Sequence, residues 1–186
     1  MKGAGRIRIS GGINQGLFIH SPPQFHSRPT QDKVRQAIFS SLGSIAIEAT
    51  VLDLYAGSGA LGIEALSRGA ERCTFVDHHF NCIKTIKSNL DYCKLNGVVT
   101  KSDALRFCQR SDPDQFDLIF LDPPYIHVDK PLDEEPILSD LRRMLRPEGR
   151  IIWEHPSRQS WNAPEKNGLL KTAKYGDSSI SYISKS

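Results

Sequence analysis

Four aspartates in this sequence follow short apolar runs, where a carboxylate could hold a cationic or amine-bearing ligand. They are Asp53, Asp77, Asp103 and Asp122. The first leads into a glycine-rich turn, after which the composition favours a helix. Such a turn lets backbone atoms approach a ligand closely, and the free N–H groups of the helix start face the same place. The pattern predicts a binding site for a nucleotide-type cofactor.

The glycine spacing alone does not choose that cofactor. Gly57-x-Gly59-x-x-Gly62, with Asp77 further along, also fits the dinucleotide fingerprint. Asp53 would repel a pyrophosphate, whereas it could pair with the sulfonium and ammonium groups of S-adenosylmethionine. We therefore expect S-adenosylmethionine, with a nicotinamide cofactor as the alternative. A purely structural role for Asp53, as a cap of the turn, is also open. The residues of the turn expected to contact the cofactor are Ala56, Gly57, Ser58 and Gly59.

A second motif consists of Asp122, Pro123, Pro124 and Tyr125. Two prolines directly after a strand fix the path of the chain and leave their carbonyls free to accept hydrogen bonds. An acid, free carbonyls and an aromatic ring predict a site that binds the exocyclic amine of a nucleobase and stacks on its ring. Asp122 and the Pro123 carbonyl would stabilise the positive charge that develops on this amine as a methyl group arrives.

Strands and helices are predicted to alternate from residue 49 onward. The apolar patterns predict strands over 49–55, 72–76, 98–100, 116–121 and 150–154, and helices over 60–68, 79–94, 104–109 and 134–145. Two further strands are expected in the tail, joined at Gly176-Asp177. Repeated βα units predict an α/β fold, with a mostly parallel sheet, helices on both faces and a closing antiparallel hairpin.

In such a sheet, ligands bind beyond the carboxyl ends of the strands, and all four aspartates would lie there. Asp77 is placed to accept hydrogen bonds from the two ribose hydroxyls of the cofactor. Asp103, with Ala104 beside it, is placed to bind the adenine amino group. For each aspartate, the alternative is an ordinary turn or helix cap.

The N-terminal segment holds most of the positive charge. The net charge of the chain is +3, yet residues 1–35 contain six basic side chains and one acid. Basic and apolar residues alternate from Arg6 to Ser10, which predicts a small β-hairpin, the flap, with one cationic face. A helix capped by Thr30 is expected to follow and to end at Gly43. This charge suits contact with a phosphate backbone, although a solvated arm without a partner would look the same.

Composition excludes several classes of protein. No run of about 18 apolar residues could span a bilayer, and no signal-peptide region is present, so a cytoplasmic protein is expected. Cys73, Cys82, Cys93 and Cys108 form no Cys-x-x-Cys pair. They predict neither a disulfide framework nor a metal site.

Two levels of resemblance follow from these motifs. Asp53-x-x-x-Gly57-x-Gly59 together with Asp122-Pro-Pro-Tyr125 resembles the class I S-adenosylmethionine-dependent amino-methyltransferases. The longer strings 28–39 (Arg-Pro-Thr-x-x-x-Val-Arg-x-x-Ile-Phe) and 56–69 are similar to the bacterial small-subunit ribosomal RNA guanine-N2 methyltransferase family, over nearly the whole chain.

The resemblance implies a Rossmann-like fold with a seven-stranded sheet, and methylation of a guanine N2 amine in 16S ribosomal RNA. The substrate would be the small subunit or an assembly intermediate, and we expect a monomer without a metal. Residues 1–44 would be a basic flap and helix packed on the core, and residues 45–186 the S-adenosylmethionine-dependent methyltransferase domain. The flap and the following loop would close over the RNA. The expected RNA contacts are Arg6, Arg8, Arg28, Thr30 and Arg35.

Three other functions are open at this stage. The closest is another amino-methyltransferase, acting on adenine N6 in DNA or on a different RNA, but a DNA enzyme usually needs a further recognition domain. A nicotinamide-dependent oxidoreductase would need a hydride-transfer acid, which we do not find. A non-catalytic RNA-binding or ribosome-assembly module would be hindered by acids beside phosphate.

Overall fold

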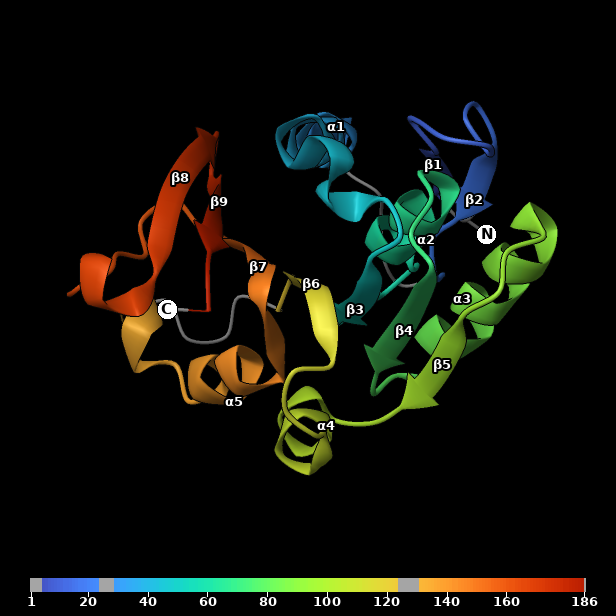
Figure 1. The fold of residues 1–186 in the computed structure, drawn as a ribbon. Coiled ribbons are helices and arrows are strands. Elements are labelled where there is room, and N and C mark those ends of the chain that lie inside the picture. The colour runs from blue at the N-terminus through green and yellow to red at the C-terminus, as the bar shows by residue number, and fades with distance from the viewer. Residues whose placement is uncertain (1–4, 24–28, 124–130, 186) are drawn as a thin grey trace.

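The computed structural model describes residues 5–23, 29–123 and 131–185, and a seven-stranded sheet runs through its centre (Figure 1). The strand order is β5-β4-β3-β6-β7-β9-β8. The strands are β3 (Thr50–Leu54), β4 (Arg72–Asp77), β5 (Val98–Lys101), β6 (Phe116–Leu121), β7 (Leu145–Pro156), β8 (Leu169–Tyr175) and β9 (Ser178–Ile183). The first five in this order are parallel, and β9 and β8 form the antiparallel hairpin. The predicted fold class is confirmed.

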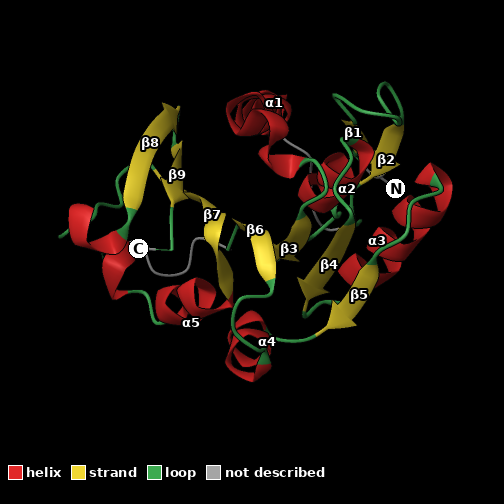
Figure 2. Ribbon diagram, viewed as in Figure 1, coloured by secondary structure: helices red, strands yellow, loops and turns green. Residues whose placement is uncertain are grey.

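Helices cover both faces of the sheet, because successive residues of a buried strand point to opposite faces. Figure 2 shows α1 (Pro29–Leu42) and α2 (Ala60–Ser67) on one side, and α4 (Ala104–Arg110) and α5 (Ile137–Met144) on the other. Helix α3 (Phe80–Cys93) joins the first side. Val51 and Phe120 belong to the core beneath α1, α2 and α3, whereas Leu52 and Ile119 belong to the core beneath α4 and α5. Short 3-10 helices are η1 (Gly43–Ala46), η2 (Leu132–Glu134) and η3 (Glu165–Asn167).

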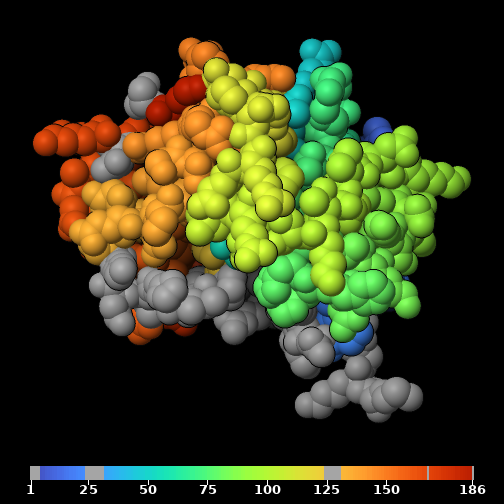
Figure 3. All heavy atoms as spheres, turned by 90° about the horizontal axis from the view of Figure 1, so that it is seen from below, coloured from blue at the N-terminus to red at the C-terminus, as the bar shows by residue number. Residues whose placement is uncertain are grey.

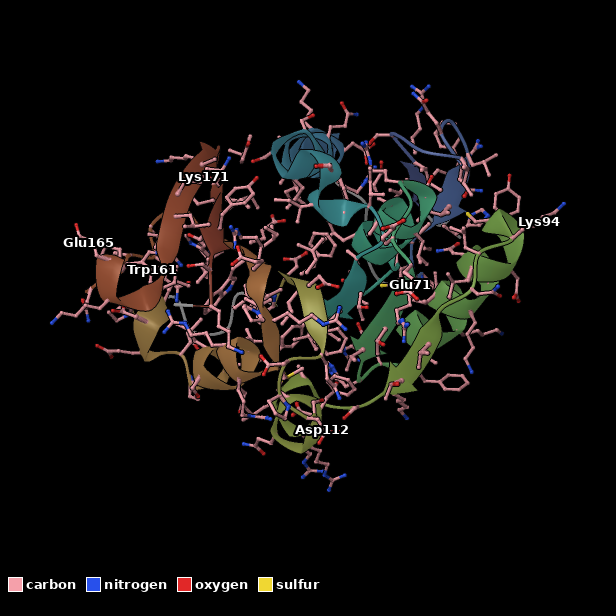
Figure 4. The ribbon with its side chains drawn as sticks, viewed as in Figure 1. Glu71, Lys94, Asp112, Trp161, Glu165 and Lys171 are labelled. Carbon is pink, nitrogen blue, oxygen red and sulfur yellow. The ribbon has the colours of Figure 1, made fainter. Side chains whose placement is uncertain are left out.

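Helices α4 and α5 pack against each other on the second face of the sheet. Viewed from below, the atoms of α4 and α5 lie side by side over that face (Figure 3). Trp161, labelled in Figure 4, packs edge-on against Trp153 of β7, with 6.3 Å between ring centroids.

Among the described residues, no helix is both long and apolar enough to cross a membrane.

The N-terminal flap forms as expected. Strands β1 (Arg6–Arg8) and β2 (Phe18–His20) pair antiparallel, with Arg6 opposite His20 and Arg8 opposite Phe18. The apolar residues of the flap, Ile7, Ile9 and Ile19, are buried in the same core as α1 and α2. The flap is therefore part of the hydrophobic core on this side of the sheet.

The buried carboxylate of Glu64 fixes the flap to α1 and α2. Glu64 of α2 is 0% exposed. It accepts hydrogen bonds from the backbone N–H of Ser10 at 2.9 Å and from its hydroxyl at 2.7 Å. Arg68 and Arg35 both donate to it, at 2.8 Å and 3.4 Å. Because the group is fully paired, its charge is tolerated inside the protein.

Three boundaries differ from the sequence predictions. Helix α1 begins at Pro29, so Thr30 lies inside its first turn and does not cap it. Helix α5 begins at 137 and not at 134, since Glu135 is extended (φ −70°, ψ 122°) before Pro136, as residues preceding proline usually are. Strand β7 begins at Leu145 and not at 150, and its pairing with β6 is irregular between Leu145 and Arg150.

We predict that Glu64→Ala lowers the free energy of unfolding by about 3–5 kcal/mol, because Arg35, which is 5% exposed, loses its buried partner. Urea denaturation would measure the change. Glu71→Ala is the control, since Glu71 pairs with Arg72 at the surface and should change the value by at most about 1 kcal/mol. Equal losses in the two variants would contradict the anchoring role of Glu64.

Candidate active site

The pairing register brings the predicted acids to one face at the carboxyl edge of the sheet. Asp53 of β3 lies opposite Phe75 of β4 and Phe120 of β6. Since side chains on one face recur every second residue, Asp77 and Asp122 share the face of Asp53. This is the face covered by α2 and α3.

Asp53 is a buried acid of β3 whose carboxylate lies against the first turn of α2. It is 2% exposed and accepts a hydrogen bond from the Gly62 N–H at 2.9 Å. Burial raises the pKa of Asp53 from 3.8 to about 7, with a further upward contribution from Asp77, while the Gly62 bond acts in the opposite direction. At neutral pH this carboxyl is close to the midpoint of its titration.

The glycine turn is held in shape by backbone geometry and by Asp77. Gly57 and Gly59 have φ values of 55° and 78°, in the left-handed region that glycine adopts without strain. Asp77 accepts hydrogen bonds from the N–H of Gly57 at 2.9 Å and of His79 at 2.8 Å. Asn89 of α3 donates to the Ser58 carbonyl and to that of His20, both at 2.9 Å. The turn is thereby tied to α3 and to the flap.

Asp122 lies beside a fourth acid, Glu154, which the sequence predictions did not include. Ile152 pairs with Phe120, so Glu154 and Asp122, each two residues further on, share one face. Burial raises the pKa of Asp122 well above its ordinary value, and the neighbouring charges of Glu154 and Asp53 raise it further. Glu154 is the last residue of the predicted strand 150–154. Its place at the end of a strand, matching that of Asp122 at the end of 116–121, was the signal in the sequence that could have identified it.

Asp103 has the capping geometry that was the alternative for it. It is the N-cap of α4, and its side chain accepts a hydrogen bond from the Arg106 N–H at 3.0 Å. The adjacent Ala104 is buried. Asp103 follows β5, which pairs with β4, so it lies at the same edge of the sheet as Asp77. A helix-capping carboxylate can accept a further hydrogen bond through its second oxygen.

The residues expected to contact RNA have different surroundings. Arg6 is exposed and lies over the Phe18 ring, 4.4 Å from its centroid, and Arg8 is also exposed. Arg35, in contrast, is 5% exposed and pairs with Asp32 and Glu64. We correct that prediction, because a buried guanidinium paired with two carboxylates is not available to a phosphate. Other expected residues, Arg28, Pro124, Tyr125 and the side chain of Thr30, lie outside what the structure describes.

Comparison with known proteins places the chain in a family. A family model described as "Conserved hypothetical protein 95" matches residues 7–184. The chain belongs to this family. A Bacillus subtilis (strain 168) protein named "Putative rRNA methyltransferase YlbH" is 40% identical over 153 residues, 80% of this chain and 82% of that relative. An Escherichia coli (strain K12) protein named "Ribosomal RNA small subunit methyltransferase D" is 38% identical over 125 residues, 66% of this chain and 62% of that relative.

Solved structures agree with this membership. "Putative methyltransferase yhhF from Escherichia coli" has a TM-score of 0.81 and 30% identity, and the match covers 96% of this chain and 97% of that one. A Thermus thermophilus 16S rRNA methyltransferase in complex with AdoMet and guanosine shares the fold, with a TM-score of 0.77 and 22% identity, over 99% of this chain and 50% of that one. The class I methyltransferase fold and the family resemblance expected from the sequence are confirmed.

We predict that Asp53 contributes a loss of stability as pH rises from about 4 to about 7, and that Asp53→Asn removes this contribution. With a raised pKa, folded Asp53 keeps a proton that the unfolded chain has released, so stability falls across this window. The two curves should differ in slope by up to about 1.4 kcal/mol per pH unit.

Urea unfolding between pH 4 and 8 would measure both curves. Asp91→Asn, an exposed position on α3, is the control and should follow the wild type. Parallel curves for the wild type and Asp53→Asn would show that Asp53 titrates as it does in the unfolded chain.

Proposed function

We propose that this protein transfers a methyl group from S-adenosylmethionine to the exocyclic N2 amine of a guanine in 16S ribosomal RNA of the small subunit. One observation carries the proposal. Asp53 and the glycine turn lie at the same edge and face of the sheet as Asp122. The relatives named as ribosomal RNA methyltransferases support the choice of substrate.

The acids of the site fit a cationic cofactor. Burial raises the pKa of both Asp53 and Asp122. Repulsion from Asp77 adds to the shift of Asp53, and repulsion from Glu154 and Asp53 to that of Asp122. No ion pair between described residues includes either of them. A carboxyl pair of this kind is stabilised in its ionised form by a positive ligand. The sulfonium and ammonium groups of S-adenosylmethionine provide that charge, and the sulfonium also activates the methyl group for transfer.

The remaining cofactor contacts follow the order of the strands. The backbone of Ala56, Gly57 and Ser58 would face the cofactor. The N–H groups of Ala56 and Gly57 are bonded to Val76 and Asp77, so N–H groups of the first turn of α2 would bind the cofactor's carboxylate. Asp77 would accept hydrogen bonds from the ribose hydroxyls through lone pairs that Gly57 and His79 do not use. Asp103 and Ala104 would lie against the adenine.

Asp122 and the Pro123 carbonyl would accept the two hydrogens of the guanine amine. Its lone pair is delocalised into the ring, so the amine is a weak nucleophile until these bonds hold it toward tetrahedral geometry. The same acceptors stabilise the positive charge that develops on nitrogen as the new N–C bond forms and the C–S bond breaks. The proton can leave afterwards, and no general base is required. Pro124 and Tyr125 are proposed to stiffen the corner and to stack on the base.

RNA would reach this site across the flap. Arg6 and Arg8 occupy alternate positions of β1 and therefore point to one side of the hairpin. Asn89 connects the flap to the glycine turn through His20 and Ser58, so RNA bound on the flap would lie close to the cofactor. Arg28 and Thr30 remain proposed RNA contacts. A monomer acting on the small subunit or on an assembly intermediate suffices for this arrangement.

A labelled methyl-transfer assay tests the proposal. Purified protein and radiolabelled S-adenosylmethionine would be incubated with unmethylated small subunits, naked 16S RNA, transfer RNA and duplex DNA. We expect label in the small subunit or in 16S RNA, at a guanine, with none in transfer RNA or DNA. Label confined to DNA, or to adenine, would overturn the proposal.

We predict that Asp122→Asn lowers kcat by about 10²–10³, because the developing charge on nitrogen loses a carboxylate. The affinity for S-adenosylhomocysteine, measured by calorimetry, should change less than about threefold. Asp117→Asn is the matched control at the opposite end of β6, where the carboxylate accepts from the Thr50 N–H. An equal loss of turnover and cofactor affinity in Asp122→Asn would assign Asp122 a structural role.

A further inference from the structure

A polar pocket lies between the flap, α1 and the far end of α2. Its volume is about 310 Å³. All of its lining residues are polar and none is acidic: Arg8, Ser10, Gln15, Gln36, Ser40 and Arg68. The glycine turn precedes α2 and Arg68 follows it, so roughly 12 Å of helix separates this pocket from the proposed cofactor site. The pocket is a second site on the protein.

Arg68 is held in place on one side of the pocket. Its guanidinium donates to Glu64 at 2.8 Å and to the Ser10 hydroxyl at 3.1 Å, and it lies over the Phe39 ring at 5.0 Å. A Cβ at Gly11 would come within 2.4 Å of it, so the guanidinium lies directly on the flap backbone. A guanidinium has five N–H groups, and these two bonds use only two of them. The others remain able to donate to an acceptor in the pocket that Arg68 lines.

The charge balance around the pocket favours an anion. Beneath it, Glu64 is fully buried and paired with Arg35 and Arg68, and Asp32 also pairs with Arg35, so two carboxylates balance two guanidiniums. No ion pair between described residues includes Arg8, whose side chain is exposed at the rim. The hydroxyl of Ser40 and the amides of Gln15 and Gln36 add further donors.

We propose that this pocket binds a phosphate of the RNA backbone, away from the guanine that is methylated. The inference rests on the proposed function, because it takes the ligand to be the substrate RNA. Arginine and small hydroxyl or amide donors are the groups that contact phosphate oxygens in nucleic-acid complexes. With no apolar or aromatic residue in its lining, the pocket offers no aromatic ring for a base to stack on. Arg6 and Arg8 lead along β1 from the end of the flap near the glycine turn to this pocket.

Such a contact orients the RNA without reading its sequence. The flap would then bind RNA at both ends, through its connection to the glycine turn and through the pocket. Because Glu64 holds both Ser10 and Arg68, the same buried group that fixes the flap also shapes the pocket.

The test places a negative charge in the pocket by Gln36→Glu, an exposed position on α1. The matched control is Gln109→Glu, the same change at an exposed position of α4 on the other face of the sheet. Filter binding would measure the affinity for labelled 16S RNA from low to high salt, and calorimetry the affinity for S-adenosylhomocysteine. We expect Gln36→Glu to weaken RNA binding about three- to fivefold at low salt, with a smaller effect as salt rises.

The control variant should bind RNA and methylate it as the wild type does, and both variants should bind S-adenosylhomocysteine normally. Equal RNA affinities for Gln36→Glu and the wild type would overturn the inference. So would a thermal stabilisation by millimolar inorganic phosphate that Gln36→Glu abolishes while RNA affinity stays unchanged, since the pocket would then bind free anions. If the wild type methylates no RNA yet binds it in this Gln36-dependent way, the proposed function fails and the phosphate site stands.

Discussion

Like-charged carboxyl groups held close together at one edge of a parallel sheet are the constraint on which this site depends. Asp53, Asp77, Asp122 and Glu154 share one face because their strands pair in register. Removing carboxylates from water while placing them near one another is unfavourable, and the raised pKa values of Asp53 and Asp122 express this. A positively charged ligand relieves the repulsion, so binding of a cation and ionisation of the acids favour each other.

The surrounding structure holds these acids where that coupling is useful. Asp53 is fixed by the backbone of α2 at Gly62, and Asp77 by the backbone of the glycine turn. On the outer side of α2, Glu64 joins the flap and α1 to the same helix. One short helix therefore supports the glycine turn at its start and the flap along its length. Asn89 of α3 joins the flap to the glycine turn as well, through the carbonyls of His20 and Ser58.

The sheet was predictable because buried parallel strands have nearly continuous apolar runs, each followed by a turn and an amphipathic helix. That pattern also placed Asp53, Asp77 and Asp122 at one edge. It could not reveal that Arg35 is buried, since its partner Glu64 comes from a helix far along the chain. The sequence pattern left two roles open for Asp103, cofactor binding and helix capping. Only the hydrogen bond from the Arg106 N–H shows that Asp103 caps α4. Glu154 was missed because it ends its strand, and its role becomes visible only once β7 is paired with β6 and Asp122 lies beside it.

Proton release on cofactor binding tests the central claim most directly. Titration calorimetry with S-adenosylmethionine at pH 6.5, in two buffers of different ionisation enthalpy, gives the number of protons exchanged. The account predicts release of roughly half to one proton for each cofactor bound, because a cation beside Asp53 lowers a pKa of about 7. Binding with no net release, or with proton uptake, would contradict it.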